Sequence, residues 1–181
     1  MGGSLQILLD FVWTSAILAT VAFSLGLILG ELKIVNVAQG DLMMVGRGDL
    51  SLPQASGQSP VREEDVWLVG ARDLDPLEAV ALDGSQVNRA AMGDLETLHF
   101  DRPVHLHVDI DVIDAAEVPA NNYPVPGGPT LAETIRACTH FAAANRLFAI
   151  SVSGWSGALD PDGRTARATA ALLAAIEESL F

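Results

Sequence analysis

The hydrophobic pattern begins with residues 11–30, a run of 20 residues without a charged side chain. At a rise of about 1.5 Å per residue, a helix of this length spans about 30 Å, the hydrocarbon thickness of a bilayer. Small residues are interleaved with large ones, which suits packing against other membrane helices. A signal peptide needs a basic segment before its apolar run, and no Lys or Arg precedes Lys33. We therefore expect a transmembrane helix rather than a signal peptide or a buried core helix.

The charges beside this run favour one orientation in a membrane. Lys33 and Arg47 follow residues 11–30, and no basic residue precedes them. Short loops that carry Lys and Arg tend to stay on the cytoplasmic side. We expect the rest of the chain to be cytoplasmic and anchored to the membrane. If the run is not inserted, the whole chain would be cytoplasmic.

Beyond residue 46 the pattern changes twice. Residues 47–64 are rich in Ser, Gly, Pro and Gln and show no apolar period, which is typical of a linker. From residue 65 onward, short apolar runs alternate with helical stretches. The pattern predicts strands at 66–71, 104–110 and 147–153, and helices at 76–83, 130–144 and 160–179. The sequence thus divides into residues 1–46, 47–64 and 65–181.

Local signals in residues 65–181 favour an α/β domain. Pro76 is a favoured residue for a first helical turn, and Thr130 with Glu133 forms a capping box. The strand–helix–strand order over residues 104–153 predicts a βαβ unit with a right-handed crossover. Strands that alternate with helices in this way predict a parallel sheet.

Composition narrows the classes of partner. The 181 residues suffice for one domain with a core, and 50% of them are hydrophobic, with a mean hydropathy of +0.34. The net charge is −13, and residues 61–181 carry 8 basic and 19 acidic side chains. An acidic domain repels phosphate backbones, so we expect no nucleic-acid partner. The lone Cys138 excludes an intramolecular disulfide and is expected to be a small buried hydrophobe.

Candidate chemistry lies in the predicted strand at 104–110 and just beyond it. Every second residue there is polar: His105, His107, Asp109 and Asp111. Such a row would share one face of the strand. A parallel strand is buried on both faces, and a buried carboxylate without a partner is costly. Ligands bind at the carboxyl ends of strands in open α/β sheets, so a shared hard cation is the functional interpretation. Solvated or helix-capping aspartates are the alternative.

The segment DIDVIDAAEVPANNYPVPGGPT resembles a metal-binding signature of the arginase/agmatinase (ureohydrolase) family. The matching positions are Asp109, Asp111, Asp114, Pro119, Pro124, Pro126, Gly127, Gly128 and Thr130. Upstream, GARDLDPLE at 70–78 is similar to the family's glycine–x–arginine–aspartate–x–aspartate segment. The resemblance covers about residues 65–181. It implies a partial three-layer α/β/α sandwich with a parallel sheet.

The same resemblance implies a reaction and residue roles. In the family, the two aspartates help to bind a pair of manganese ions, so Asp109 and Asp111 would be metal ligands. Asp114 would hold the loop in shape. His107 stands where the family often has serine, and we expect a neutral, hydrogen-bonded histidine rather than a ligand or proton shuttle. His105 is expected to be structural. The reaction would be hydrolysis of a guanidino or amidino C–N bond of a small molecule.

Several family features are missing from this chain. The glycine–glycine–aspartate–histidine and aspartate–alanine–histidine–x–aspartate motifs, which supply the other metal ligands, are absent. The segment ISVSGWSG lacks the glutamate that contacts the guanidinium, and its Trp155 is expected to pack in the core rather than line a pocket. We therefore expect at most one weakly held Mn²⁺ or Mg²⁺ and weak or absent activity. Oligomerisation stays open.

A second resemblance concerns the N-terminal part. Residues 25–46 are similar to the start of branched-chain amino-acid ABC transporter permeases, with matches at Asn36, Ala38, Gly40 and Asp41. No second apolar run of comparable length follows, and one helix cannot enclose a transport path. A membrane component related to these permeases is the alternative function. A composite chain with neither activity is a further alternative.

Overall fold

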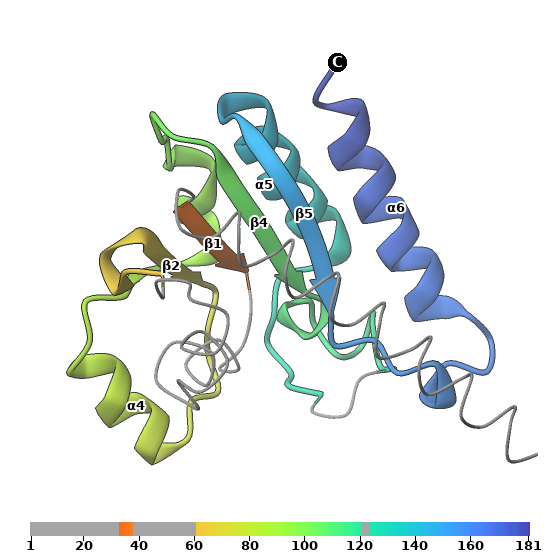
Figure 1. Ribbon diagram of the computed structural model, residues 1–181. Helices are drawn as coiled ribbons and strands as arrows, with labels where there is room; N and C mark the ends of the chain where they lie inside the picture. Colours follow the sequence, from red (N-terminus) through yellow and green to blue (C-terminus); the bar gives the residue numbers. More distant parts are fainter. Residues whose placement is uncertain (1–32, 38–60, 121–123) are drawn as a thin grey trace, which may run out of the picture.

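A computed structural model of the chain describes residues 33–37, 61–120 and 124–181, which contain a parallel sheet of five strands (Figure 1). The strands are β1 (Lys33–Val37), β2 (Val66–Val69), β3 (Asn88–Ala90), β4 (Val104–Asp109) and β5 (Leu147–Ser153). They lie side by side in the order β3-β2-β1-β4-β5. The helices are α4 (Pro76–Asp83), α5 (Leu131–Ala144) and α6 (Arg164–Glu178). Short 3-10 turns are η1 (Glu63–Asp65), η2 (Met92–Thr97), η3 (Ile110–Val112) and η4 (Gly157–Leu159).

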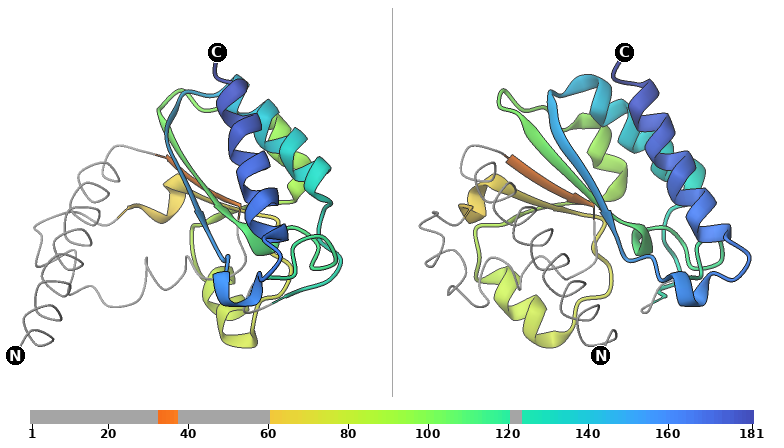
Figure 2. Two further views of the ribbon diagram at one scale, coloured as in Figure 1. Left: turned by 90° about the vertical axis from the view of Figure 1, so that its right-hand side faces the viewer. Right: turned by 45° about the vertical axis from the view of Figure 1, so that its right-hand side comes forward.

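Helices α5 and α6 cover one face of the sheet (Figure 2). Leu106 and Val108 of β4 are fully buried in a core with Phe141 of α5 and Leu172 of α6. Apolar residues alternate along β4 because every second side chain points into this layer. The predicted α/β class and parallel pairing are confirmed. The described residues show the sheet and one helical layer of the expected three-layer sandwich.

Cys138 lies within the same core and has no solvent exposure. Burial in apolar surroundings raises the pKa of its thiol to about 12, because the charged thiolate is poorly solvated there. The thiol is therefore inert near neutral pH. The prediction of a small buried hydrophobe is confirmed.

Helix boundaries follow local capping chemistry. Thr130 accepts a hydrogen bond from the backbone N–H of Glu133, and the Glu133 carboxylate accepts from the N–H of Thr130, so the predicted capping box is confirmed. The last helix starts at Arg164, not near residue 160 as the pattern predicted. Gly163 precedes it in a left-handed conformation, with φ 68°, which an L side chain rarely adopts.

Strand β1, like the short strand β3, is a part of the sheet that the sequence pattern did not predict. It pairs in parallel with β2 on one side and with β4 on the other, so it lies at the centre of the sheet. The sequence pattern places residues 33–37 in the N-terminal unit, outside the α/β domain. The sheet therefore includes a strand from before residue 65. The remaining boundaries of the three units stay a prediction, because residues 1–32 and 38–60 lie outside the described residues.

The predicted membrane helix at 11–30 also lies outside the described residues. Among the helices that the structure does describe, none is long and apolar enough to cross a bilayer.

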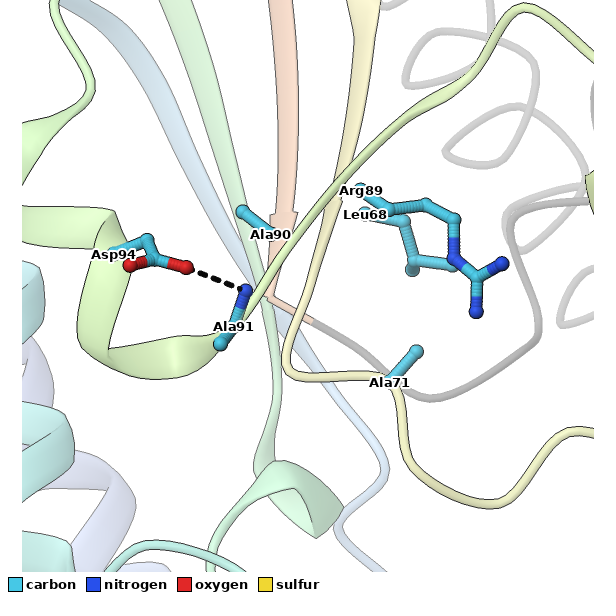
Figure 3. A pocket seen from close by; sticks show the side chains of 6 residues that line it. All are labelled: Leu68, Ala71, Arg89, Ala90, Ala91 and Asp94. Atoms are coloured by element: carbon cyan, nitrogen blue, oxygen red, sulfur yellow. Dashed lines mark hydrogen bonds between the residues drawn. The ribbon is translucent and has the colours of Figure 1, made fainter.

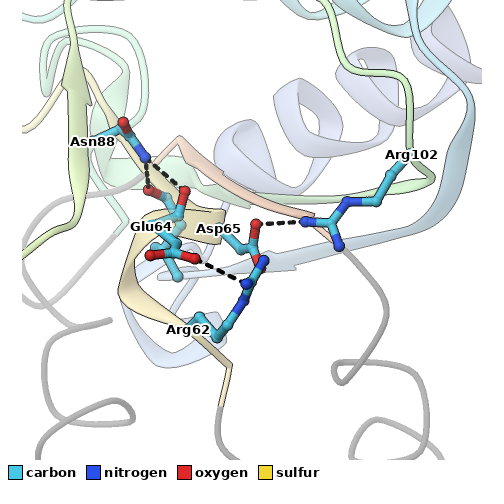
Figure 4. A network of polar contacts seen from close by, with 6 residues as sticks. Arg62, Glu64, Asp65, Asn88 and Arg102 are labelled. Atoms are coloured by element: carbon cyan, nitrogen blue, oxygen red, sulfur yellow. Dashed lines mark hydrogen bonds and ion pairs between the residues drawn. The ribbon is translucent and has the colours of Figure 1, made fainter.

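An ion-pair cluster joins the start of β2 to the start of β4 (Figure 4). Asp65 is 6% exposed and accepts hydrogen bonds from Arg62, at 2.7 and 2.9 Å, and from Arg102, at 2.5 Å. Nearby, the Asn88 amide donates to the carbonyls of Glu64 and Val66 at 3.0 and 3.1 Å. These contacts tie the amino ends of β2, β3 and β4 together.

We expect Asp65→Ala to lower the free energy of unfolding by roughly 1–3 kcal/mol, because it removes charge-assisted hydrogen bonds from two arginines. Asp83→Ala is the matched control, since Asp83 makes an exposed pair with Arg89 at 3.1 Å. Such exposed pairs contribute about 0–1 kcal/mol. Urea denaturation of both variants checks this. Equal losses for the two variants would show that the buried cluster adds nothing beyond a surface pair.

Candidate metal site

Asp109 is the last residue of β4 and is only 4% exposed. Its Oδ2 accepts a hydrogen bond from the Ser153 hydroxyl at 3.1 Å. Its Oδ1 is buried and has no hydrogen-bond partner among the described residues. A buried carboxylate oxygen in this condition is costly unless something else compensates its charge. A bound cation would compensate the charge of this carboxylate.

Gly154, directly after β5, makes room for this carboxylate. A Cβ at position 154 would lie 3.1 Å from Asp109 Cγ and would overlap Oδ1 outright. The backbone φ of Gly154 is 83°, which also disfavours any L side chain. Space and backbone conformation thus both require glycine here. The role of Gly154 was not predicted; the available signal was a glycine directly after the predicted strand at 147–153.

The alternating pattern predicted that Asp111 continues the polar row of the strand. The structure places it beyond the end of the strand. β4 ends at Asp109, and Asp111 belongs to the 3-10 turn η3. The strand period therefore does not set its direction. Its side chain is still buried, at 9% exposure. The two aspartates thus follow each other into the turn at the carboxyl end of β4, where open α/β sheets bind ligands.

Asp114 holds the loop that follows. Its Oδ1 accepts from the N–H of Ala116 at 2.8 Å, and its Oδ2 accepts from the N–H of Gly127 at 2.6 Å. These hydrogen bonds lower the pKa of Asp114, with a smaller contribution from the charge of Arg72. The contacts join Asp114 to both ends of the loop.

Asp114→Asn should therefore lower stability at pH 7, and the deficit should shrink in acid. A carboxyl with a depressed folded-state pKa stabilises the fold above its ordinary pKa, and this contribution is lost as the pH falls through the depressed value. The two urea midpoints should thus converge below about pH 4. Asp101→Asn, an exposed carboxyl in a turn, is the control and should leave the pH profile unchanged. A constant deficit at every pH would contradict this role of the Asp114 charge.

Arg72, which follows β2 in the sequence, holds the turn η3 in place. Its guanidinium donates to the carbonyl of Val112 at 2.6 Å, of Asp111 at 3.0 Å and of Val125 at 2.9 Å. Three carbonyls from two loop segments thus meet one planar donor group. The role of Arg72 was not predicted. The available signal was its place in the segment GARDLDPLE, which resembles the family's segment with an arginine after a strand.

Gly128 lets the returning loop pack onto the same turn. A Cβ at this position would lie 2.5 Å from the Val112 carbonyl oxygen and 2.7 Å from the Asp114 nitrogen. Both atoms belong to the backbone and cannot move aside easily. The glycine is therefore required by close approach of two chain segments. The Pro–Gly-rich loop is in this way held against η3.

The two histidines of β4 lie in a row with serines of β5. The Ser151 hydroxyl lies 2.8 Å from His105 Nε2 and 2.7 Å from His107 Nδ1, and the Ser153 hydroxyl lies 2.9 Å from His107 Nε2. Burial lowers the pKa of both histidines, and the charge of Asp109 only partly opposes this at His107. Burial thus favours the neutral form of both rings. His107 is thus hydrogen-bonded at both ring nitrogens, and its expected neutral, supporting role stays a prediction. The roles of Ser151 and Ser153 were missed.

The sequence predicted that Trp155 packs in the core. This prediction is wrong, because the residue is 51% exposed. Its indole N–H donates to Asp160 Oδ2 at 3.0 Å. Asp160 also accepts from the N–H groups of Thr165 and Ala166, at the start of α6. Burial would raise the pKa of Asp160, but these hydrogen bonds outweigh it and lower the pKa. Trp155 thus belongs to the capping arrangement of α6.

A shallow hollow lies elsewhere, beside β2 and β3 (Figure 3). It is lined by Leu68, Ala71, Arg89, Ala90, Ala91 and Asp94. The Asp94 carboxylate accepts a hydrogen bond from the Ala91 N–H at 3.2 Å. The Arg89 side chain points away from Asp94. The lining shares no residue with the predicted site. We therefore assign the chemistry to the end of β4 and not to this hollow.

The described residues offer few further ligands for a metal. Across residues 61–120 and 124–181, no group of three or more His, Cys, Asp or Glu side chains is placed to hold a metal ion. Asp109 fits a cation because of its orphaned Oδ1, and Asp111 follows it into the turn. The donor set of the described chain thus fits a cation in part.

Comparison with known proteins agrees with this fold. The arginase family model matches residues 52–177, and the chain therefore belongs to the arginase family. Arginase of Schizosaccharomyces pombe is 30% identical over 107 residues, which are 51% of this chain and 33% of that protein. Non-hepatic arginase 1 of Xenopus laevis is 27% identical over 146 residues, or 72% of this chain and 41% of that protein. The chain thus spans well under half the length of these relatives.

Solved structures of the same family share the fold. Arginase from Bacillus cereus superposes with a TM-score of 0.72 at 24% identity, covering 86% of this chain and 65% of that chain. The agmatine ureohydrolase of Thermoplasma volcanium superposes with a TM-score of 0.65 at 20% identity, covering 83% and 55%. At these identities the likeness supports the arginase-like α/β fold alone.

Proposed function

We propose that this chain is an arginase-type hydrolase domain with a single weak cation site at Asp109 and Asp111. The observation that carries the proposal is the buried Oδ1 of Asp109, which has no hydrogen-bond partner in the described part of the chain. Asp109 ends a strand of the sheet, where this fold class binds its ligands. Membership of the arginase family supplies the chemical context.

The proposed ligand is Mn²⁺ or Mg²⁺, because both accept carboxylate oxygens. Asp109 and Asp111 would hold it, and Arg72 and Asp114 would keep the turn and loop beneath them in place. When bound, the cation would supply a water made nucleophilic near neutral pH, for attack on a guanidino or amidino carbon. The proposed substrate class follows the family, and no side chain of this chain is assigned to the guanidinium.

We propose that this hydrolysis is weak or absent in this chain. The family motifs that carry further histidine ligands are missing from the sequence, and all four histidines, at 99, 105, 107 and 140, lie outside such motifs. Two carboxylates cannot complete the ligand shells of two metal ions, each of which prefers several oxygen or nitrogen ligands. A two-metal clamp is therefore not available from these residues.

Urea release from arginine and agmatine, with excess Mn²⁺, tests this proposal. We expect no turnover above the protein-free background. Asp109→Ala and Asp101→Ala serve as the site variant and its surface control. Turnover that persists in Asp101→Ala and disappears in Asp109→Ala would show that unidentified groups complete an active site, and the proposal of impaired catalysis would be wrong.

Membrane attachment through residues 11–30 is a separate proposal. The uncharged run of 20 residues supports it. A deletion of residues 1–30 removes the run and keeps strand β1, which a longer deletion would remove. We expect the full chain to sediment with membranes at high salt and the shortened chain to stay soluble. A full chain that stays soluble without detergent would refute the anchor and remove the basis of the transporter-related alternative.

A further inference from the structure

A row of polar side chains runs along neighbouring strands β4 and β5 towards Asp109. In the strand register His107 lies opposite Ser151, and Asp109 lies opposite Ser153. Four short contacts link five side chains in the order His105, Ser151, His107, Ser153 and Asp109, at 2.8, 2.7, 2.9 and 3.1 Å. We call the first four residues the His–Ser chain. It is continuous, and it ends on a candidate metal ligand.

The direction of the chain follows from the number of hydrogens available. The Asp109 carboxylate only accepts, so the single hydroxyl hydrogen of Ser153 goes to Asp109 Oδ2. Ser153 can then only accept from His107, so His107 carries its hydrogen on Nε2.

The same count extends to the far end. A neutral His107 with hydrogen on Nε2 has a bare Nδ1, which must accept from the Ser151 hydroxyl. Ser151 has then used its hydrogen and must accept from His105 Nε2–H. This leaves His105 Nδ1 as a bare acceptor, and that buried atom has no hydrogen-bond partner within the described residues. The opposite direction would leave a buried N–H donor unpaired there and would turn a lone pair of Ser153 towards the carboxylate.

We propose that the His–Ser chain is a positioning device that ties down one oxygen of Asp109 and leaves the other for a cation. The inference rests on the proposed cation site. Ser153 holds Oδ2, while Oδ1 lies where a Cβ of residue 154 would be and makes no hydrogen bond among the described residues. Ser153, His107 and Ser151 are positioning residues, because they act through Asp109 and not on a substrate.

Burial supports an ordered chain over a loosely solvated one. Asp109 and His105, at the two ends, are 4% and 6% exposed. His107, Ser151 and Ser153 between them are half-buried, and each of these three is held by hydrogen bonds to a neighbour on both sides. A hydrogen-bonded carboxylate that offers one oxygen in a fixed direction binds a metal better than a freely rotating one.

Long-range ¹H–¹⁵N correlation spectra of the 181-residue chain test the direction at pH 7.5. We expect His107 and His105 both to carry hydrogen on Nε2, with both Nδ1 atoms unprotonated. In Ser153→Ala, His107 loses its Nε2–H acceptor, so a mixture with the Nδ1–H form should appear. Wild-type His107 in the Nδ1–H form, or a tautomer that does not respond to Ser153→Ala, would overturn the inference. A purely structural role for Ser153 would not move this signal.

Mn²⁺ affinity, followed by the electron paramagnetic resonance of free Mn²⁺, tests the consequence for the metal. Loss of a hydrogen bond to a metal ligand typically weakens binding by about 10–100-fold, and we expect Ser153→Ala to fall in that range. Ser153→Thr keeps the hydroxyl and should restore binding. Ser179→Ala is the control, since its hydroxyl bonds the Ile176 carbonyl at 2.7 Å at the end of α6. Equal affinity of wild type and Ser153→Ala would overturn the positioning role.

The two measurements separate two failures. If wild type binds no Mn²⁺ but shows the expected tautomers and their response to Ser153→Ala, the proposed cation site is wrong and the order of the His–Ser chain stands. If wild type binds Mn²⁺ but the tautomers are reversed, the cation site stands and the inferred chain is wrong.

Discussion

Gly154→Ala is expected to destabilise the fold by about 2–5 kcal/mol and to weaken Mn²⁺ binding at least tenfold. The added Cβ would overlap Asp109 Oδ1, so the carboxylate must rotate away from its place beside Ser153. Overpacking in a tight site typically costs about 1–3 kcal/mol. A left-handed backbone adds about 1–2 kcal/mol for a residue with a Cβ. Urea denaturation and Mn²⁺ titration of the full chain measure the two effects.

Gly127→Ala separates backbone strain from the clash. Gly127 has φ 80°, nearly the same as Gly154, but a Cβ there would meet nothing within 4 Å. It should therefore show only the conformational cost, about 1–2 kcal/mol, and should leave Mn²⁺ affinity unchanged. If both variants lose the same stability and both keep Mn²⁺ affinity, the space beside Asp109 has no role in the site.

Arg72→Met is expected to cost about 3 kcal/mol or more. The change keeps an unbranched side chain but removes the donors to three carbonyls, of Asp111, Val112 and Val125. Buried acceptors that lose a charged donor carry a desolvation penalty of about 1–3 kcal/mol each, and these losses are not fully additive. Arg72→Lys should recover only part of the loss, because one ammonium cannot reproduce the planar fork. Thermal and urea unfolding check both variants.

Arg89→Met is the matched control for Arg72→Met. Arg89 makes an exposed ion pair with Asp83, with side chains 52% and 73% exposed. Its replacement should change stability by less than about 1 kcal/mol. A loss at Arg72 no larger than this would mean that water replaces the three hydrogen bonds without cost, and Arg72 would not fix the turn.

Much of the fold follows from local sequence signals. Thr130 and Glu133 cap α5 as the sequence predicts, and β5 spans Leu147–Ser153 as its apolar run predicts. The start of α6 was wrong because Gly163, with φ 68°, interrupts the chain after residue 160. A helix-start pattern does not show that a left-handed residue will follow it.

Other elements depend on long-range pairing that a window of sequence cannot show. β1 closely follows the uncharged run at 11–30, so the sequence pattern places it in the N-terminal unit. Only its pairing with β2 and β4 places it in the sheet. β3 is three residues, Asn88–Ala90, of which Arg89 is exposed, so it carries almost no apolar signal. Strand assignment at such positions is decided by neighbours, not by propensity.

The candidate site was predictable in its acidic residues and not in its supports. Asp109 and Asp114 stand out because of their spacing and the Pro–Gly loop that follows them. Arg72, Ser153 and Gly154 come from other strands and loops, and their roles depend on contacts across the sheet. Asp111 shows the limit of a period-2 pattern, since the strand ends two residues earlier.

The central claim is that Asp109 anchors one weak cation site in an arginase-family chain whose described residues do not complete a two-metal centre. Equilibrium titration of the full chain with Mn²⁺ tests it most directly. We predict no more than one Mn²⁺ per chain, with a Kd on the order of 10⁻⁴ M or weaker, as expected of a site with few oxygen ligands. Binding should be lost in Asp109→Ala and kept in Asp101→Ala. Two tightly bound Mn²⁺ ions per chain, or binding that is unchanged in Asp109→Ala, would contradict the account.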